Sequence, residues 1–440
     1  MGQRMNNNRN IPNAWRILIL LFLANLLNFF DRAIPAIIIE PIRKEWGLSD
    51  MQLGLAAAAF ILVYAVAGLP LGRFADTHSR KTIVGWGLTA WSGFTALNAL
   101  AWSYMSFLFV RVGVGVGEAS FAPAANSMIG DLFPPERRAR AIGIFMLGLP
   151  LGSLLAFVTV GWMVDFFGTW RAPFLISAIP GLILAFLIFS IREPVRGASD
   201  AVVGNDLPIS QPFLSLLRIK TFRWLIASGV TLTIAGNAGA AFLVPLMQRH
   251  FEQSMTNAGI RVGLIIGATG LVGLLVGGWL ADALHKKYRL GRMLFGVVGL
   301  LFAGLFTGAG LLFCSNDVTL FTVLFGCGWL MLFSYYTSAY PAIQDIVQPR
   351  QRATAIGLYF ALMYIFGGAF GPLMLGAISD HLAQQAMLTA GTMQMTESFK
   401  AVGLYGAMYL IPVVLLLTSV FLALATRSYL ADAESMKKGQ

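Results

Sequence analysis

Apolar runs of about 20 residues recur along this 440-residue chain, and each is long enough to cross the hydrocarbon core of a bilayer. Only 12% of the residues are charged, whereas soluble domains carry about 25%, so the chain has too few charges to cover a water-facing surface. The sequence therefore predicts an all-α integral membrane protein whose partner is the lipid bilayer. Its twelve predicted spans lie at residues 15–38, 51–73, 82–101, 105–130, 139–163, 171–191, 221–245, 259–281, 292–313, 318–340, 352–377 and 401–426.

The basic residues predict which side of the membrane the termini occupy. Most of the 31 lysines and arginines fall in the terminal segments and in the short loops on the same side. Loops rich in lysine and arginine stay in the cytoplasm, so we expect both termini there. We expect a multi-pass protein of the plasma membrane, which in bacteria is the inner membrane. The net charge of +11 is explained by this topology and does not indicate a nucleic-acid partner. The opposite side receives only Arg43, Lys44, Arg171, Arg249, Arg261 and Lys400.

Two sequence repeats divide the chain into related halves. Residues 131–143 and 345–357 match at seven of thirteen positions, and each segment follows the fourth span of its half. Residues 72–76 (GRFAD) and 278–282 (GWLAD) likewise each end a second span. Parallel repeats of this kind place a substrate site between the halves. We predict six-helix halves at 1–193 and 220–440, related by a pseudo-two-fold axis and joined by a cytoplasmic linker at 194–219.

Four charged residues fall inside predicted spans, where a charge is costly and usually functional. Asp31 and Arg32 lie in the first span, and Arg111 and Glu118 lie in the fourth. At ~1.5 Å rise per residue, Asp31 and Arg111 both lie ~10 Å below the outer surface, so they can pair if their spans are neighbours. Glu118 is two helical turns from Arg111 and shares its face of the helix.

A carboxylate that loses a guanidinium partner in a dry site takes up a proton more readily. We therefore predict that Asp31 and Glu118 carry protons, with the proton gradient as the energy source and no cofactor. Arg32 and Arg111 would hold an anionic substrate group or balance the carboxylates. The alternative is a static ion-pair network that fixes helix packing, and Arg32 has the further option of extending outward to the interface.

The second half is poor in buried charge, and its polar residues are mainly tyrosines. With Asn28 of the first half, we expect Asn237, Tyr335, Tyr336 and Tyr340 to line the cavity. A cavity charged on one wall and aromatic on the other suits an amphiphile or a partly apolar organic anion better than a free sugar. The sequence shows no metal-ligand spacing and no nucleophile motif, so we expect neither an enzyme nor a metal site. We expect the protein to act as a monomer.

The loop from Gly72 to Lys81 resembles the loop signature of the major facilitator superfamily, which has twelve helices in two halves. Gly72 would let two helices approach closely, and Asp76 could cap a helix or pair with a basic residue. The second copy keeps Asp282. The resemblance implies a cytoplasmic gate, closed in one transport state. Its predicted members are Gly72, Asp76, Arg80, Lys81, Asp131, Arg138, Asp282, Asp345 and Arg352.

Further stretches resemble the Spinster branch of that superfamily, whose animal members are proton-dependent carriers of lysophospholipids or sphingosine phosphates. They are 28–32 (NFFDR), Arg111 with 117–120 (GEAS) and Pro123, 129–133 (IGDLF), 170–174 (WRAPF) and 192–194 (REP). The resemblance ties Asp31, Arg111 and Glu118 to proton coupling. Phe30 replaces a common hydroxylated aromatic, and Thr169 replaces a glycine.

Other functions stay open at this stage. The same NxxDR start and R…GEA run occur in the anion:cation symporter branch, which carries sugar acids and other organic anions. Multidrug efflux is a further alternative. A non-transporting lipid sensor or scramblase on the same scaffold would need no proton coupling.

Overall fold

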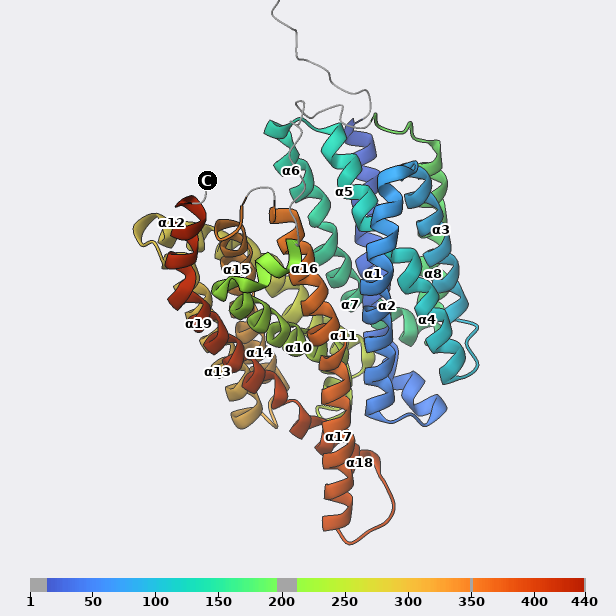
Figure 1. The fold of residues 1–440 in the computed structure, drawn as a ribbon. Coiled ribbons are helices and arrows are strands. Elements are labelled where there is room, and N and C mark those ends of the chain that lie inside the picture. Colours follow the sequence, from blue (N-terminus) through green and yellow to red (C-terminus); the bar gives the residue numbers. More distant parts are fainter. Residues whose placement is uncertain (1–13, 196–211, 349–350, 439–440) are drawn as a thin grey trace, which may run out of the picture.

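The computed structural model describes residues 14–195, 212–348 and 351–438, and its regular structure in these ranges is helical (Figure 1). The first half contains α1 (Ala14–Trp46), α2 (Asp50–Thr77), α3 (Arg80–Asn98), α4 (Tyr104–Ala119), α5 (Phe121–Leu132), α6 (Pro135–Met146), α7 (Gly148–Phe167) and α8 (Ala172–Ser190). The second contains α9 (Pro212–Arg218), α10 (Lys220–Arg249), α11 (Met255–Val262), η1 (Gly263–Ala268), α12 (Thr269–Lys287), α13 (Gly291–Phe313), α14 (Val318–Leu332), α15 (Ser334–Asp345), α16 (Arg352–Met363), η3 (Tyr364–Gly368), α17 (Phe370–Thr389), α18 (Glu397–Ala407) and α19 (Leu410–Lys438).

Each of the twelve predicted spans corresponds to one helix or to consecutive helices. In the described residues, eleven of them are long and apolar enough to cross a membrane. The exception is α3, a less apolar helix of 19 residues that packs against α4 and α8. Of the predicted linker, residues 196–211 lie outside the described residues, and its last part forms the short helix α9.

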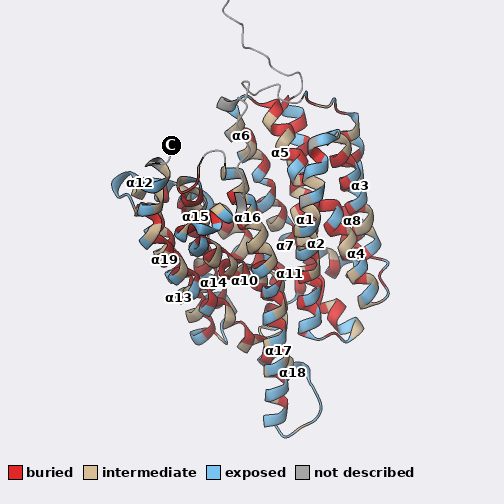
Figure 2. Ribbon diagram, in the orientation of Figure 1, coloured by how far each residue is buried: buried red, intermediate tan, exposed pale blue. Residues whose placement is uncertain are grey.

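The outer surface of the helical bundle is apolar. Figure 2 shows buried residues on the inward sides of the helices and exposed residues on the outer sides. The exposed positions include large hydrophobic side chains, such as Phe109 (73% exposed), Phe186 (74%) and Phe313 (80%). An apolar surface of this kind matches lipid tails as its solvent.

Both ends of the described chain lie at one end of the molecule. We call the end where α1 begins and α19 finishes the terminal face, and the opposite end the distal face (Figure 1). The two halves pack together through α2 with α17 and through α7 with α11 and η1. Near the distal face, backbone meets backbone at glycines. An ideal Cβ on Gly54 would lie 2.3 Å from the carbonyl oxygen of Pro372, and one on Gly376 would lie 2.3 Å from that of Asp50.

Interrupted helices surround the middle of the molecule. The fourth span breaks at Ser120, whose hydroxyl donates to the Gly117 carbonyl at 2.8 Å. The eighth and eleventh spans contain the π-helical segments η1 and η3. Such irregular backbone is tolerated at membrane depth where it is buried in protein or lines a cavity, and π-bulges are frequent at functional sites.

A charged and aromatic cavity between the halves

A cavity of about 390 Å³ lies between the two halves. Its first-half wall is built by α1, α2, α4 and α7, and it presents two guanidinium groups, those of Arg32 and Arg111. The facing wall, from α10, α14–α16 and η3, carries no charged residue. Its polar and aromatic lining residues are Thr233, Asn237, Phe242, Trp329, Phe333, Tyr336, Tyr340 and Tyr364. The first half also lines the cavity with Phe29, Phe60, Tyr64, Phe107 and Phe157, so both walls are aromatic and only the first-half wall is charged.

Arg32 is held by an ion pair that joins the first and fourth spans. Its Nε donates to Glu118 Oε2 at 2.6 Å, and the Glu118 side chain is fully buried while that of Arg32 is 22% exposed. The guanidinium of Arg32 also lies over Tyr64, 4.2 Å from the ring centroid. Arg32 is thus fixed on one side by a carboxylate and an aromatic ring, while it faces the cavity on the other.

Arg111 has a different environment. Its guanidinium lies over Phe60 at 4.5 Å from the ring centroid, and the guanidinium of Arg32 lies 5.5 Å from the same centroid. The described residues provide Arg111 with no hydrogen bond and no ion pair within 4 Å. A buried guanidinium without an anionic partner, on a cavity wall, is free to bind an anionic group of a ligand.

The expected pair of Asp31 with Arg111 is not formed, and this prediction was wrong for the present conformation. Asp31 is 1% exposed, and both of its carboxylate oxygens lack a hydrogen-bond partner. Its closest polar neighbours are Ser177 on α8 and Trp91 on α3. Adjacent residues of a helix point about 100° apart. When Arg32 faces the cavity and Glu118, Asp31 therefore points toward α3 and α8.

Among the expected cavity residues, Asn237, Tyr336 and Tyr340 line the cavity. Tyr335 does not, because it is fully buried behind the wall and its hydroxyl meets Ser228 and Tyr359 at 2.9 and 2.7 Å. Asn28 is also buried, at 3% exposure, and its Nδ2 has no hydrogen-bond partner. Placing these two on the cavity surface was wrong, since residue type alone does not fix the direction of a side chain on its helix.

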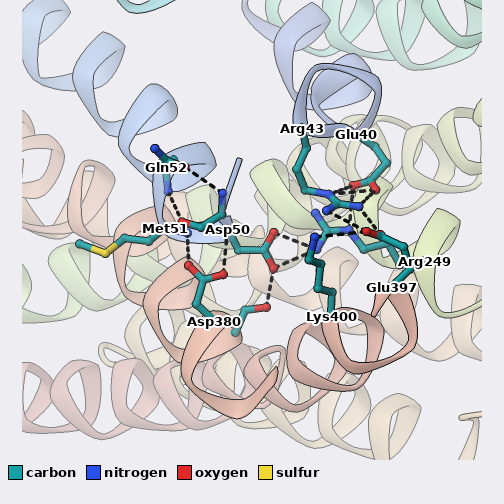
Figure 3. Close-up of polar contacts among 11 residues, drawn as sticks. Glu40, Arg43, Asp50, Met51, Gln52, Arg249, Asp380, Glu397 and Lys400 are labelled. Atoms are coloured by element: carbon teal, nitrogen blue, oxygen red, sulfur yellow. Dashed lines mark hydrogen bonds and ion pairs between the residues drawn. The ribbon is translucent and has the colours of Figure 1, made fainter. Parts of the chain in front are cut away.

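A network of charged residues joins the halves at the distal face (Figure 3). Arg249, at the end of α10, bonds Glu40 of α1 at 2.7 Å and Asp50 of α2 at 2.8 Å. The side chains of all three are 3–4% exposed. Arg43 of α1 bonds both Glu40 and Glu397 of α18.

The α17 helix adds polar contacts to this network. The Asp380 carboxylate accepts from the backbone N–H groups of Asp50 and Met51, at 2.9 and 2.8 Å, and so caps the start of α2. The Ser379 hydroxyl donates to Asp50 at 2.6 Å. The hydrogen bonds and ion pairs that join the halves among the described residues lie at this face, which they hold closed in this conformation.

The sequence alone does not predict this network. The predicted first span ends at residue 38, which places Arg43 in a loop, and Arg249 is likewise predicted to lie in a loop. In the structure, α1 continues to Trp46 and buries Glu40 and Arg43 near its end. One sequence pattern does point to the longer helix. Glu40 and Arg43 are three residues apart, so they would share one face of a helix that continues past residue 38.

The predicted gate residues on the terminal face pair within their own halves. Buried Arg80 bonds Asp131 and bonds Glu193 at 3.0 Å. In the second half, Arg292 bonds Asp282 at 2.7 Å and approaches Asp345 at 4.0 Å. Asp345 occupies the position in its repeat that Asp131 occupies in the first. In each half, this carboxylate therefore lies beside an arginine from the start of the third span.

The other predicted gate residues contact nearby backbone. Lys81 Nζ donates to the Ile191 carbonyl at 2.9 Å, Arg138 donates to that of Gly130 at 2.7 Å, and Arg352 donates to that of Gln344 at 3.2 Å. An ideal Cβ on Gly72 would be 3.7 Å from Pro123. The side chain of Asp76 lies outside the described residues.

Glu193 follows α8 and lies outside the spans. Burial alone would raise the pKa of its carboxyl, but the Lys81 N–H, the Ser79 hydroxyl and Arg80 all donate to the carboxylate and lower the pKa below its usual value. Glu193 therefore stays ionised and fixes the start of α3 to the end of α8.

The comparisons with known proteins agree with this architecture. Residues 21–372 match the family profile of the Major Facilitator Superfamily. An MFS-type efflux pump of Mycolicibacterium smegmatis is 31% identical over 373 residues, covering 84% of this chain and 85% of that protein. The sphingosine-1-phosphate transporter SPNS2 of Xenopus tropicalis is 26% identical over 435 residues, covering 95% and 83%.

A solved structure is also similar over nearly the whole length. It is the crystal structure of a bacterial homologue of the human lysosomal transporter Spinster in an inward-facing, unoccupied conformation. It has a TM-score of 0.87 and 27% identity, and the match covers 96% of this chain and 98% of that one.

The fold and the cavity between two parallel halves define a membrane transporter rather than an enzyme. The chain belongs to the Major Facilitator Superfamily and, within it, to the Spinster-like branch.

Proposed function

We propose that this transporter is proton-coupled, works by alternating access, and carries an amphipathic, lipid-like substrate with an anionic head group. The observation that carries the proposal is the two-sided cavity, in which Arg32 and Arg111 face a wall of aromatic and apolar side chains.

The guanidinium of Arg111 supplies a binding group for a phosphate or carboxylate, and Arg32 stands beside it. The facing wall offers aromatic and apolar surface for a hydrocarbon chain, beside the hydrogen-bonding groups of its threonine, asparagine, tryptophan and tyrosines. The similarity to a sphingosine-1-phosphate transporter supports a lipid-like substrate. The prediction is therefore a lysophospholipid or sphingolipid type of substrate.

Asp31 and Glu118 are the proposed proton carriers. Both are buried in the first half, at 1% exposure. Glu118 has Arg32 as its partner, whereas Asp31 has none. A substrate anion that draws Arg32 away from Glu118 would leave that carboxylate unpaired and favour its protonation. The protonation state and the substrate would then bias the same conformational equilibrium.

We further propose that the terminal face is cytoplasmic and that the present conformation is inward-facing. The distribution of basic residues supports the first point. The distal network and the close contacts at Gly54 and Gly376, together with the similarity to an inward-facing structure, support the second.

Neutral amides at the two carboxylates test proton coupling. In proteoliposomes, Asp31→Asn and Glu118→Gln should abolish uptake of labelled sphingosine 1-phosphate driven by a proton gradient. The matched control is Glu434→Gln, which changes a side chain that is 60% exposed on α19. Full gradient-driven uptake by both amide variants would refute the coupling assignment, and a preference for glucuronate over the lipid would refute the substrate class.

A second candidate is the export of apolar or drug-like compounds. The relative from Mycolicibacterium smegmatis is an efflux pump, and the predominantly apolar cavity lining would accept such compounds. Ethidium efflux from cells, compared between the wild type and Arg111→Ala, distinguishes the two. An anionic lipid substrate requires Arg111, whereas a cationic drug does not.

Counterflow separates transport from a sensor or scramblase. Liposomes preloaded with unlabelled sphingosine 1-phosphate should accumulate the labelled lipid above its equilibrium level if alternating access operates. A scramblase would only equilibrate the lipid.

A further inference from the structure

Unpartnered polar atoms line one face of α3. Trp91 Nε1, Ser92 Oγ, Thr95 Oγ1 and Asn98 Oδ1 are buried and have no hydrogen-bond partner among the described residues. These four residues are 0–2% exposed. The hydroxyls differ from that of Thr307, which donates to the carbonyl one turn back in its own helix. Ser92, Thr95 and Asn98 recur every three residues, so they form one stripe along the helix.

The stripe faces the space around Asp31. An ideal Cβ on Gly181 of α8 would lie 2.0 Å from Ser92 Oγ and 3.1 Å from Leu27 of α1, so the three helices meet at this level. One turn nearer the distal face, α1 presents Asp31, α3 presents Thr95 and α8 presents Ser177. Trp91 and Ser177 are the polar neighbours of the Asp31 carboxylate.

Buried polar atoms without a partner cost about 1–3 kcal/mol each, and ordered water is the usual way to satisfy them. The two carboxylate oxygens of Asp31 and the amide oxygen of Asn98 accept hydrogen bonds, the Trp91 N–H donates one, and the hydroxyls do both. Water can bridge such a mixture of donors and acceptors, whereas an anion or a metal ion would leave part of it unsatisfied.

We propose that this stripe holds a file of buried water that conducts protons between the distal face and Asp31, separately from the substrate cavity. The inference rests on the proposed role of Asp31 in proton coupling. It adds a route that the cavity does not share, because the stripe residues do not line the cavity.

The distal end of the stripe comes close to a surface ion pair. Asn98 is one turn from Ala101, whose carbonyl accepts from Arg171 at 3.2 Å, and Arg171 bonds Glu45 at 2.8 Å. The Glu45 and Arg171 side chains are 40% and 32% exposed, so this end of the route meets the distal solution. Along the file, each water accepts a proton and passes one on. The net step removes one proton from the distal solution and forms one O–H bond on Asp31.

The charged groups near Asp31 have other partners, so its carboxylate can take up or release a proton. From α4, Arg111 and Glu118 act on it electrostatically. Arg111 is held over Phe60, and Glu118 is engaged by Arg32. The described α3 and α8 contribute only neutral groups at this level, since α8 carries no charge and the charges of α3 are at its terminal end.

Time-resolved infrared spectroscopy after an acid jump tests the route without a transport substrate. The carboxylic-acid band that is lost in Asp31→Asn reports protonation of Asp31. In the variant Thr95→Val, the band should appear about fivefold more slowly, because a lost relay hydrogen bond raises the barrier by roughly 1 kcal/mol. Thr307→Val is the matched control and should behave like the wild type, since its hydroxyl serves only its own helix.

Radiolytic labelling of the wild type provides a second measurement that needs no variant. Trp91 should be hydroxylated by adjacent water although it is 0% exposed, whereas Phe222, also 0% exposed, should not. An unlabelled Trp91, or a wild-type protonation rate in Thr95→Val, would overturn the route. Neither outcome would affect gradient-driven uptake or its loss in Asp31→Asn, so failure of the route and failure of proton coupling are distinguishable.

Discussion

At the scale of single residues, the ring of Phe60 allows two guanidinium groups to share one wall. Arg111 and Arg32 lie 4.5 and 5.5 Å from its centroid. Each such contact contributes about 0.5–2 kcal/mol, depending on desolvation. Glu118 neutralises one of the two positive charges, so the wall presents one unpaired guanidinium rather than two repelling ones. Under the proposed function, this arrangement would suit a substrate with a single anionic head group.

Glu193 gives the residue-scale prediction of pH dependence. Because hydrogen bonds hold the pKa of its carboxyl below 4.5, the folded state favours the ionised form. Its stabilising contribution is fully present above pH 4.5 and disappears as the pH falls through the lower folded-state pKa. Glu193→Gln should cost about 1 kcal/mol at neutral pH, a modest value because the side chain is 30% exposed.

Thermal unfolding in detergent from pH 7 to pH 3 measures this difference, with Glu434→Gln as the exposed control. The gap between the wild type and Glu193→Gln should close toward pH 3. A gap that is constant with pH would show that packing, rather than the charge, is responsible.

The sequence predicts how deep the charged residues lie in the membrane, but not which way their side chains point around the helix. The four buried charges were found because charges inside apolar runs are rare. The pairing was wrong because Asp31 and Arg32 are adjacent, and which of them faces α4 depends on how α1 packs on α7 and α8. Phe60 and Tyr64 were missed because aromatic residues in an apolar span give no distinctive signal.

At the scale of elements, the spans were predictable from hydropathy, and their ends and breaks were not. The first predicted span ends eight residues before Trp46, because the charges of Glu40 and Arg43 are typical of a loop. In the structure these charges are satisfied by partners from α10 and α18, which no local pattern reveals. The breaks at Ser120 and in η3 lie where other helices pack closely, with Gly87 of α3 beside Ser120 and Val230 of α10 beside Gly367.

The seam between α2 and α17 gives an element-scale prediction. A methyl group on Gly376 would lie 2.3 Å from the Asp50 carbonyl oxygen, which is backbone and cannot rotate away. Gly376→Ala should therefore force the two helices apart and lower the population of the distally closed conformation. Spin labels at Trp102 and Met393, exposed at 80% and 88% in one distal loop of each half, should report a longer distance.

Gly93→Ala is the control, because nothing lies within 4 Å of its ideal Cβ. Alanine is favoured over glycine in a helix by about 1 kcal/mol, so the control should be as stable as the wild type or more so. An unchanged distance distribution in Gly376→Ala would show that the seam does not limit opening.

At the scale of the whole molecule, the internal repeat explains why the two faces behave differently. On the terminal face, corresponding arginines, Arg80 and Arg292, bind carboxylates of their own half. On the distal face, Arg249 of one half binds Glu40 and Asp50 of the other. The present conformation is thus joined across the halves distally, and in the proposed alternating-access cycle the terminal pairs would exchange partners. The repeat and its topology were visible in the sequence, but the conformation adopted was not.

Removing Arg249 should release the distal lock. The Arg249→Met variant leaves Glu40 with Arg43 and leaves Asp50 with only the Ser379 hydroxyl, both buried. Breaking a buried pair by removing one partner costs about 3–5 kcal/mol, and a shift from 99:1 to 1:99 needs about 5.5 kcal/mol. Most of the population should therefore leave the distally closed conformation, and the distance between labels at Trp102 and Met393 should lengthen.

Arg289→Met, at an 82% exposed arginine, should leave the distribution unchanged. Adding Asp50→Asn to Arg249→Met removes the uncompensated charge and should restore part of the closed population. If the double variant were as open as the single one, the lock would depend on the shape of Arg249 and not on its charge.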